Sequence, residues 1–306
     1  MLDKKLKAMG GQWRKAGRAL VRRMEHQISP PTWVRAGHYY SPIPDWKELE
    51  KDASKLFGPA PGSLAGIDLN ASGQLETLHA LEALLDARLY APGSEAGLRY
   101  HPDNNMFGQK SANMLHLMLR HLRPQRIIEV GSGFSTAVML DTIEHSLGGE
   151  VALTCIEPYP KRLFGTMQDG DERLCSVIEE RLQEVPMATF EELQSGDILF
   201  VDSSHVLKTG SDLCRLFFEI LPALAVGTHV HFHDIYYPFE YPREWLEQGR
   251  SWNEAYALRL FLSDNSQYTI EFWGSYLHHC HRSEFERVPE LFADQSSLWI
   301  RKTGPA

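Results

Sequence analysis

The pattern of apolar and polar positions separates an irregular N-terminal part of the chain from a regular C-terminal part. From about Phe107 onward, short apolar runs alternate with segments whose apolar residues recur at helical spacing. Strands that alternate with helical segments indicate βαβ units and a parallel sheet. In chain order, the expected strands read RIIEV, VALTCIE, LCSVIE, DILFVD, THVHFHD, YTIEFW and SSLWIRK.

The expected helices lie at residues 110–122 and 135–145, near Lys161 and Thr189, and at residues 211–221 and 253–262. The last two strands leave no room for a crossover helix, so we expect them to form an antiparallel hairpin at the sheet edge. Residues 103–306 are therefore predicted to form a doubly wound, Rossmann-like α/β sheet that is mostly parallel.

Residues 1–102 are expected to form a basic helix followed by a cap on the sheet domain. Within residues 2–27, Met9, Trp13 and Leu20 recur at helical spacing, and lysines and arginines crowd much of the remaining surface. Such a helix can contact an anionic membrane surface, but we favour a solvated helix that packs on the domain or a loose arm. Prolines and glycines interrupt the following residues, apart from one helix expected at residues 73–90.

Composition narrows the classes of partner and location. The 306 residues carry a formal net charge of −9, which disfavours a nucleic-acid partner. No apolar run approaches the roughly 20 residues of a transmembrane helix, and charges interrupt the start of the chain, where a signal peptide would need an apolar core. The four cysteines form no CxxC pair, so we expect a reducing, cytoplasmic location. Homo-oligomerisation stays open.

The strongest motif runs from Glu129 to Thr136, with the sequence EVGSGFST, and links an expected strand to an expected helix. Gly131 and Gly133 allow a tight turn and a close approach to a ligand. Ser135 and Thr136 stand where a dinucleotide-binding motif would have its third glycine, which disfavours NAD. The Glu129 carboxylate suits the cationic methionyl end of S-adenosylmethionine, directly or through water.

Glu157 ends the next expected strand, where an acidic side chain can accept hydrogen bonds from both ribose hydroxyls. Together with the glycine turn and the strand order, it resembles the cofactor motifs of class I methyltransferases. The resemblance implies S-adenosylmethionine as cofactor. The alternative is a Rossmann-like fold that has the tight turn and no ligand. The residues implied in cofactor binding are Glu129, Gly131, Ser132, Gly133, Ser135, Glu157 and Asp202.

Two carboxylates end neighbouring strands of the expected sheet: Asp202 is the last residue of DILFVD, and Asp234 is the last residue of THVHFHD. The carboxyl ends of such strands open into the crevice where doubly wound sheets bind ligands. Two carboxylates there favour a divalent cation, which can lower the pKa of a substrate hydroxyl and orient it. His205 leaves the strand with Asp202, which makes it the better candidate for a general base.

The Asp202-x-x-His205 pattern and the Asp234 strand end resemble small-molecule methyltransferases of the macrocin O-methyltransferase and cephalosporin hydroxylase-like type. They are also similar to catechol O-methyltransferase, except that Ile235 stands where that family has asparagine. The third metal ligand is therefore open between His205 and His233, and the metal between Mg and, with a histidine ligand, Mn, Fe or Zn. Asp202, His205 and His233 are the candidate catalytic residues, and Asp202, Asp234 and His205 the candidate metal ligands.

Other histidines are expected to be structural. Strand alternation puts His229, His231 and His233 on one face of their strand and Asp234 on the other, so we interpret His229 and His231 as core or supporting residues. The histidines of residues 278–281 look like part of a polar loop. The aromatic segment at residues 236–256 is interpreted either as a lid over the acceptor or as a packing element.

The leading hypothesis is methyl transfer from S-adenosylmethionine to a small molecule, on oxygen rather than nitrogen, with His205 or Asp202 removing the proton. One alternative keeps the fold and the metal in a hydroxylase-like or hydrolytic enzyme. Another is a non-catalytic protein that binds the cofactor.

Overall fold

The structure is a computed structural model that describes residues 32–85, 90 and 97–304. Their contacts form two compact units, one ending at Leu56 and one beginning at Phe57. The basic helix expected at residues 2–27 lies outside the described residues. In the first unit, α2 spans Trp46–Leu56. Everything below concerns the second unit.

The elements of the second unit follow one another largely as the sequence pattern predicts. The strands are β1 (Arg126–Val130), β2 (Ala152–Ile156), β3 (Cys175–Ile178), β4 (Ile198–Val201), β5 (His229–Phe232), β6 (Tyr268–Trp273) and β7 (Leu298–Lys302). The longer helices are α3 (Ala71–Glu82), α4 (Gln109–Leu122), α5 (Phe134–Ser146), α11 (Glu254–Leu262) and α12 (Gly274–Cys280). The shorter helices are α6 (Lys161–Phe164), α7 (Met187–Glu191), α8 (Asp212–Arg215), α9 (Leu221–Ala223), α10 (Arg243–Glu247) and α13 (Arg282–Phe285). The single turns of other helix types are η1 (Asp171–Arg173), η2 (Leu182–Glu184) and the π-helical η3 (Leu216–Ile220).

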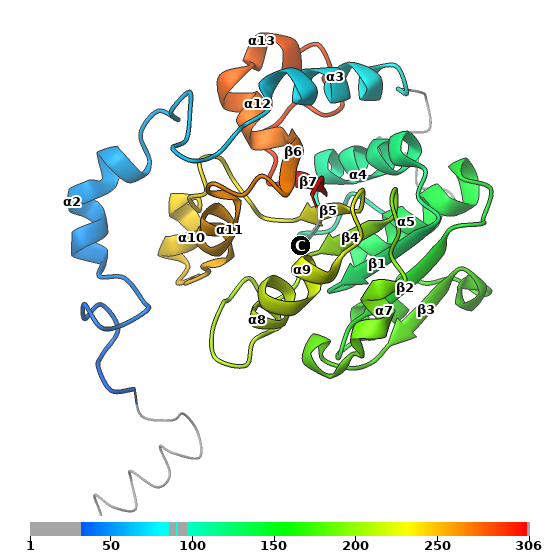
Figure 1. The fold of residues 1–306 in the computed structure, drawn as a ribbon, viewed down its shortest axis with the longest axis horizontal. Helices are drawn as coiled ribbons and strands as arrows, with labels where there is room; N and C mark the ends of the chain where they lie inside the picture. The colour runs from blue at the N-terminus through cyan, green and yellow to red at the C-terminus, as the bar shows by residue number, and fades with distance from the viewer. Residues whose placement is uncertain (1–31, 86–89, 91–96, 305–306) are drawn as a thin grey trace, which may run out of the picture. The chain divides into compact units, whose positions relative to one another are not determined.

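The strands form one sheet in the order β3-β2-β1-β4-β5-β7-β6 (Figure 1). The first five are parallel, and β7 is antiparallel to both β5 and β6. This confirms the doubly wound, Rossmann-like fold and its antiparallel edge. One detail was wrong: β6 and β7 are joined by α12 and α13 rather than by a short turn. The connection is not a crossover, because β7 returns between β5 and β6.

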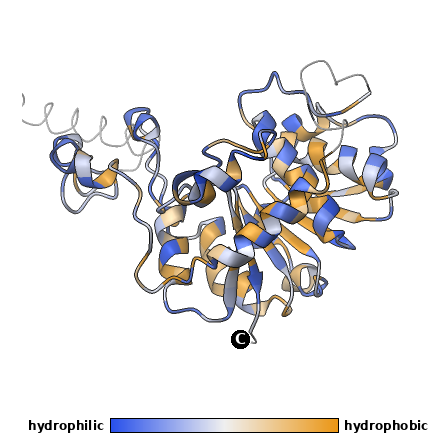
Figure 2. Ribbon diagram, turned by 90° about the horizontal axis from the view of Figure 1, so that it is seen from above, coloured by the Kyte–Doolittle hydropathy of each residue, from blue (hydrophilic) through white to orange (hydrophobic). Residues whose placement is uncertain are grey.

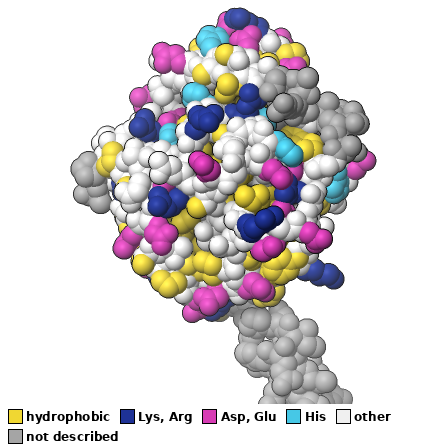
Figure 3. Space-filling model, turned by 90° about the vertical axis from the view of Figure 1, so that its right-hand side faces the viewer, with side chains coloured by type: hydrophobic (Ala, Val, Ile, Leu, Met, Phe, Trp, Pro, Cys, Tyr) yellow, Lys and Arg dark blue, Asp and Glu magenta, His cyan; other side chains and the backbone are white. Residues whose placement is uncertain are grey.

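The core lies on both faces of the sheet. All four residues of β4 and of β5 are buried, as expected for parallel strands that are covered on each side. In Figure 2, hydrophobic segments lie towards the middle of this unit and hydrophilic segments around them. Among the described residues, no helix combines the length and the apolar character needed to cross a membrane. On the face shown in Figure 3, acidic and basic side chains are interspersed.

Residues 57–85 pack against the sheet domain through α3, which contacts α4 and β6. The Gln74 side chain accepts a hydrogen bond from the Trp273 backbone N–H at 2.8 Å, and Asn70 donates to the Ile270 carbonyl at 2.9 Å. These bonds satisfy backbone groups at the outer strand β6. That residues 1–102 act as a unit separate from residues 103–306 stays a prediction.

Residues just before α4 are held by a buried ionic cluster. The Arg99 guanidinium binds Asp171 at 2.5 Å, Glu144 at 2.8 Å and Asp141 at 3.1 Å. The Asp141 carboxylate also accepts the backbone N–H groups of Arg99 and Tyr100. Because one cation bridges α5 and η1, the approach to α4 is fixed against the side of the sheet that carries β1 and β2.

The turns after β1 and β4 touch each other at Gly131. The Asp202 backbone N–H donates to the Val130 carbonyl at 2.9 Å, and Gly131 has a φ of +82°. A Cβ atom at Gly131 would lie 1.9 Å from the Asp202 carbonyl oxygen. Only glycine allows both this close approach and this backbone conformation.

We therefore predict that Gly131→Ala lowers the free energy of unfolding by more than about 3 kcal/mol, because the clash adds to the strain of a positive φ. The measurement is chemical denaturation. Gly148→Ala is the matched control, since Gly148 has a φ of +78° and no heavy atom within 4 Å of an added Cβ. That control should cost only about 1–2 kcal/mol. Equal costs for the two variants would contradict the close approach.

Candidate functional site

The glycine loop is built on a buried carboxyl group. Glu129 lies on β1 below the turn and accepts hydrogen bonds from Ser135 Oγ at 2.6 Å and Thr136 Oγ1 at 2.5 Å. Thr136 Oγ1 in turn accepts the Gly133 backbone N–H at 3.0 Å. Burial raises the pKa of Glu129 to about 7, against the opposing effect of these hydrogen bonds. Glu129 thus shapes the turn from beneath it, and its expected contact with the methionyl group stays a prediction.

A cavity of about 890 Å³ lies above this turn, at the carboxyl ends of the parallel strands. Gly131, Ser132, Gly133 and Ser135 line one side of it, together with Glu157 at the end of β2. The Glu157 carboxylate accepts the backbone N–H groups of Ser132 at 3.2 Å and Tyr159 at 2.8 Å. Glu157 therefore ties the glycine loop to the next strand, and each of its oxygens keeps a further lone pair for a ligand.

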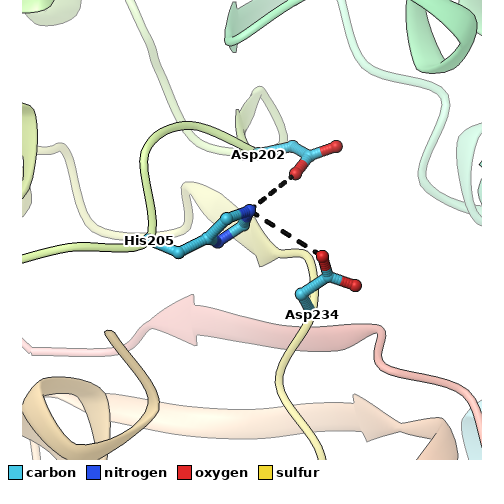
Figure 4. Close-up of side chains that lie close together, drawn as sticks. All are labelled: Asp202, His205 and Asp234. Atoms are coloured by element: carbon cyan, nitrogen blue, oxygen red, sulfur yellow. Dashed lines mark ion pairs between the residues drawn. The ribbon is translucent and has the colours of Figure 1, made fainter. Parts of the chain in front are cut away.

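Asp202, His205 and Asp234 meet on the other side of the same cavity (Figure 4). His205 Nε2 lies 3.3 Å from Asp202 Oδ1 and 3.8 Å from Asp234 Oδ2. One ligand atom from each residue can be chosen so that all three lie within 4.8 Å of one another. Asp234 also accepts a hydrogen bond from Ser296 Oγ at 3.1 Å. The structure thus brings together the three residues that the sequence nominated as metal ligands.

The orientation of His205 is fixed from behind by α11. Its Nδ1 atom lies 2.7 Å from Oε2 of the fully buried Glu254, and its ring packs on Trp252 with centroids 4.2 Å apart. The His205 carbonyl accepts the backbone N–H groups of Asn253 and Glu254 at the start of α11. Because Nδ1 is engaged by a carboxylate, Nε2 is the ring atom presented to Asp202 and Asp234.

The electrostatics of the cluster favour ionised partners. Burial alone would raise the pKa of Asp202, but the charge of His233 and the hydrogen bond from His205 outweigh it and lower that pKa. Burial alone would lower the pKa of His205, but Asp202 and Glu254 hold it well above the usual value of 6.5. A positive charge is therefore stabilised at the position of Nε2.

The remaining histidines have separate environments. The His231 ring stacks on Phe200 and lies 4.7 Å from Trp299, and burial lowers its pKa. His229 Nδ1 lies 2.6 Å from Glu271. Both lie within the fold, as expected for core or supporting residues. His279 and His281 bind Asp294 and Tyr276, and the metal-ligand cluster found among the described residues includes neither.

His233 follows β5 and is buried beside the cluster. Its Nε2 atom lies 3.7 Å from Asp234 Oδ1, and its ring packs 4.9 Å from that of Phe107. Its Nδ1 atom has no hydrogen-bond partner among the described residues. A catalytic role for His233 stays a prediction.

Comparison with known proteins finds a match over the segment that carries the glycine loop and the cluster. A family model described as a methyltransferase domain matches residues 128–235, from β1 to just beyond Asp234. An uncharacterised protein of Archaeoglobus fulgidus is 32% identical over 177 residues, which cover 56% of this chain and 76% of that protein. The chain belongs to the class I, S-adenosylmethionine-dependent methyltransferases.

Solved methyltransferases resemble this enzyme at low identity. The S-adenosylhomocysteine-bound methyltransferase PaMTH1 of Podospora anserina is 12% identical, with a TM-score of 0.42 over 85% of this chain and 97% of that one. The O-methyltransferase TomG of Streptomyces achromogenes, in complex with S-adenosylmethionine, is 14% identical, with a TM-score of 0.40 over the same shares. Neither similarity bears on the acceptor of this methyltransferase.

The aromatic segment after Asp234 divides into two parts in the methyltransferase. Tyr237, Phe239 and Tyr241 are buried, and the Tyr237 hydroxyl binds the Pro61 carbonyl. Trp245 and Trp252, by contrast, line the cavity. The segment therefore packs as core over residues 237–241 and forms cavity wall over residues 245–252. The packing interpretation therefore holds for residues 237–241, whereas a lid over the acceptor stays a prediction for residues 245–252.

Sequence reasoning missed three partners of the cluster, namely Glu254, Trp252 and Ser296. Glu254 is separated from His205 by 49 residues, and no local pattern connects them. The Asn253–Glu254 pair at the start of a predicted helix gave a helix boundary but no indication of its neighbour. Ser296 immediately precedes the segment that forms β7, so its place beside Asp234 follows only from the strand order.

The raised pKa of Glu129 predicts a specific pH dependence of stability. Between its ordinary value of 4.5 and about 7, the folded protein keeps a proton that the unfolded chain has lost, so this contribution to stability declines as pH rises. Glu129→Gln stays neutral throughout. Between pH 4.5 and pH 8, the free energy of unfolding of the wild type should therefore fall more than that of Glu129→Gln. The difference between the two decreases should reach up to about 3 kcal/mol.

Denaturant titrations at the two pH values measure this difference. Glu180→Gln, at an exposed position beyond β3, is the control and should fall in parallel with the wild type. If Glu129→Gln also follows the wild type in parallel, folding does not raise the pKa of Glu129.

Proposed function

We propose that this methyltransferase methylates an oxygen atom of a small molecule with the help of a divalent cation. One observation carries the proposal: the glycine loop and the Asp202–His205–Asp234 cluster open on the same cavity. A methyl donor seated at the first and a hydroxyl held at the second would face each other across it.

The cofactor side of the cavity offers the groups that S-adenosylmethionine needs. Gly131 and Gly133 leave room for close approach, and Ser132 and Ser135 also line the wall. Glu157 stands at the end of β2, where a carboxylate would accept the ribose hydroxyls. Asp202 lies between the two sides and would contact the cofactor as well as the cation.

The donor set at the cluster fits a cation. Two carboxylates and one imidazole offer hard oxygen ligands and a single nitrogen, which suits Mg, Mn or Fe. His205 has the arrangement typical of a metal-bound histidine, since Glu254 engages the opposite ring nitrogen. The stabilised positive charge at Nε2 is consistent with a cation held there.

Methyl transfer would form a bond from the acceptor oxygen to the methyl carbon and break the carbon–sulfur bond of the donor, which leaves as S-adenosylhomocysteine. The hydroxyl proton would pass to the ionised Asp202. A bound cation would lower the pKa of that hydroxyl and neutralise charge beside it. Asp202, Asp234 and His205 would hold the cation and fix the direction of attack. Trp252 shields one face of His205 and excludes water from it.

The two alternative functions differ in which side of the cavity they need. A hydrolytic or hydroxylase-like enzyme would need the cluster but has no use for Glu157 as a ribose acceptor. A non-catalytic protein that binds the cofactor would need Glu157 and have no use for a cation. The two substitutions below therefore test the two halves of the proposal independently.

We expect S-adenosylhomocysteine to bind the purified protein, and Glu157→Ala to weaken that binding by about 10- to 100-fold, because charged hydrogen bonds to the ribose are lost. Isothermal titration calorimetry measures the affinity. Glu179→Ala removes an exposed acid beyond β3 that does not line the cavity, and it should leave the affinity unchanged. A wild type that does not bind the ligand would end the methyltransferase proposal.

We expect Mn²⁺ to bind the protein and Asp234→Asn to weaken that binding by about tenfold or more, because one anionic ligand is removed. Calorimetry in the presence of S-adenosylhomocysteine measures both affinities, and the S-adenosylhomocysteine affinity should change little. Glu244→Gln removes an exposed charge from α10 and serves as the control. Methyl transfer that survives both chelation and Asp234→Asn would show that the cation has no catalytic role.

A further inference from the structure

An arginine lies over two indole rings at the acceptor side of the cavity, and the two rings contact each other edge-to-face with centroids 5.2 Å apart. The Arg250 guanidinium carbon lies 4.5 Å from the Trp245 ring centroid and 5.0 Å from that of Trp252. The Arg250 backbone N–H donates to the Trp245 carbonyl at 3.0 Å, which closes the turn between them. Stacking on aromatic faces fixes the plane of a guanidinium but does not satisfy its N–H groups, which point outward along its edges.

The N–H donors of Arg250 have no acceptor within the part of the chain that the structure describes. No carboxylate of those residues lies within 4.0 Å of its nitrogens, and no hydrogen bond involves its side chain. The other arginine of this segment differs: Arg243 Nε binds Glu247 at 3.0 Å and does not line the cavity. Arg250 is thus a half-buried cation with an oriented fork of free donors.

The position of Arg250 links it to the acceptor rather than to the cofactor. Trp252, which stacks on Arg250, also packs on His205 with ring centroids 4.2 Å apart. The cavity's other arginines belong to the cofactor side. Arg162 lies against Gly133, and Arg181 is paired with Glu184. Only the ring of Trp252 therefore separates Arg250 from His205, so a molecule bound at the Asp202–His205–Asp234 cluster lies near Arg250.

We infer that the acceptor carries an oxyanion, a carboxylate or a phosphate, that Arg250 binds while the hydroxyl to be methylated lies at the cluster. The inference rests on the proposed function and names the class of its substrate. The fork of donors matches two oxygens of a planar or tetrahedral anion. Trp245 and Trp252 hold the fork in place before binding, so that little side-chain entropy is lost when the anion arrives.

The test uses three small probes of similar size, namely benzoate, phenyl phosphate and the neutral benzamide. Each is titrated into the full-length protein loaded with S-adenosylhomocysteine, in buffer with a chelator so that no cation can bind the anions. We expect one anion or both to bind at least about tenfold more tightly than benzamide, a difference of about 1.4 kcal/mol. The stronger of the two anions identifies the acceptor group as carboxylate or phosphate.

Two variants of Arg250 and one control separate the fork from simple charge. Arg250→Gln should reduce the ratio of anion affinity to benzamide affinity to about one. Arg250→Lys should retain only part of the preference, because lysine keeps the charge but not the planar fork. Arg243→Gln removes a charge from the same segment and should leave the preference intact. An unchanged affinity for S-adenosylhomocysteine shows that each variant is folded.

The inference is overturned if the wild type shows no preference for either anion, including no measurable binding of both. It is also overturned if the preference survives Arg250→Gln. The anion titrations are repeated without S-adenosylhomocysteine. Failure of S-adenosylhomocysteine to bind would refute the methyltransferase proposal, whereas normal binding without an anion preference would refute only the role of Arg250.

Discussion

The contact between the turns after β1 and β4 is the constraint on which the site depends. Gly131 has no side chain because the Asp202 carbonyl occupies the space where its Cβ would lie. The glycine loop and Asp202 are therefore held against each other by backbone packing. Since β5 pairs with β4 in parallel, Asp234 arrives beside Asp202 at the same edge of the sheet. The positions of Asp202 and Asp234 relative to the loop are therefore set by the sheet, whereas α11 fixes His205.

The pKa values of two carboxyl groups on opposite sides of this contact are shifted in opposite directions. Glu129 lies below the turn, where burial raises its pKa and hydroxyl donors from α5 share it. Asp202 lies above the turn and stays ionised, because histidines outweigh the effect of its burial. The contact between the two turns thus has a carboxyl group with a raised pKa on one side, which shapes the loop, and an ionised carboxylate on the other, which faces the cavity. Environments that shift the pKa values of similar groups in opposite directions are typical of sites where one group has a structural role and another a chemical role.

The sequence predicts the parts of this architecture that have local signals. The strand pattern places Asp202 and Asp234 at adjacent strand ends, and His205 follows three residues after Asp202, so the cluster could be assembled without coordinates. Glu254 and Trp252 could not, because their contact with His205 depends on how the chain returns after a long loop. The alternation of Tyr237, Phe239 and Tyr241 is a strand-like period that indicated burial and was available in the sequence. The helices between β6 and β7 were missed because residues 274–297 are rich in histidine and polar residues.

The bond from the Ala255 backbone N–H to the Tyr241 hydroxyl, at 3.0 Å, closes residues 242–254 into a loop with anchored ends. One anchor is a buried tyrosine, and the other is the start of α11, where the His205 carbonyl accepts two N–H groups. Changes inside the loop alter what surrounds the acceptor, while the anchors hold His205 where it is. Such an arrangement allows substitutions in one loop to change the selectivity of an enzyme without rebuilding its reaction centre, because the ends of the loop stay at fixed points.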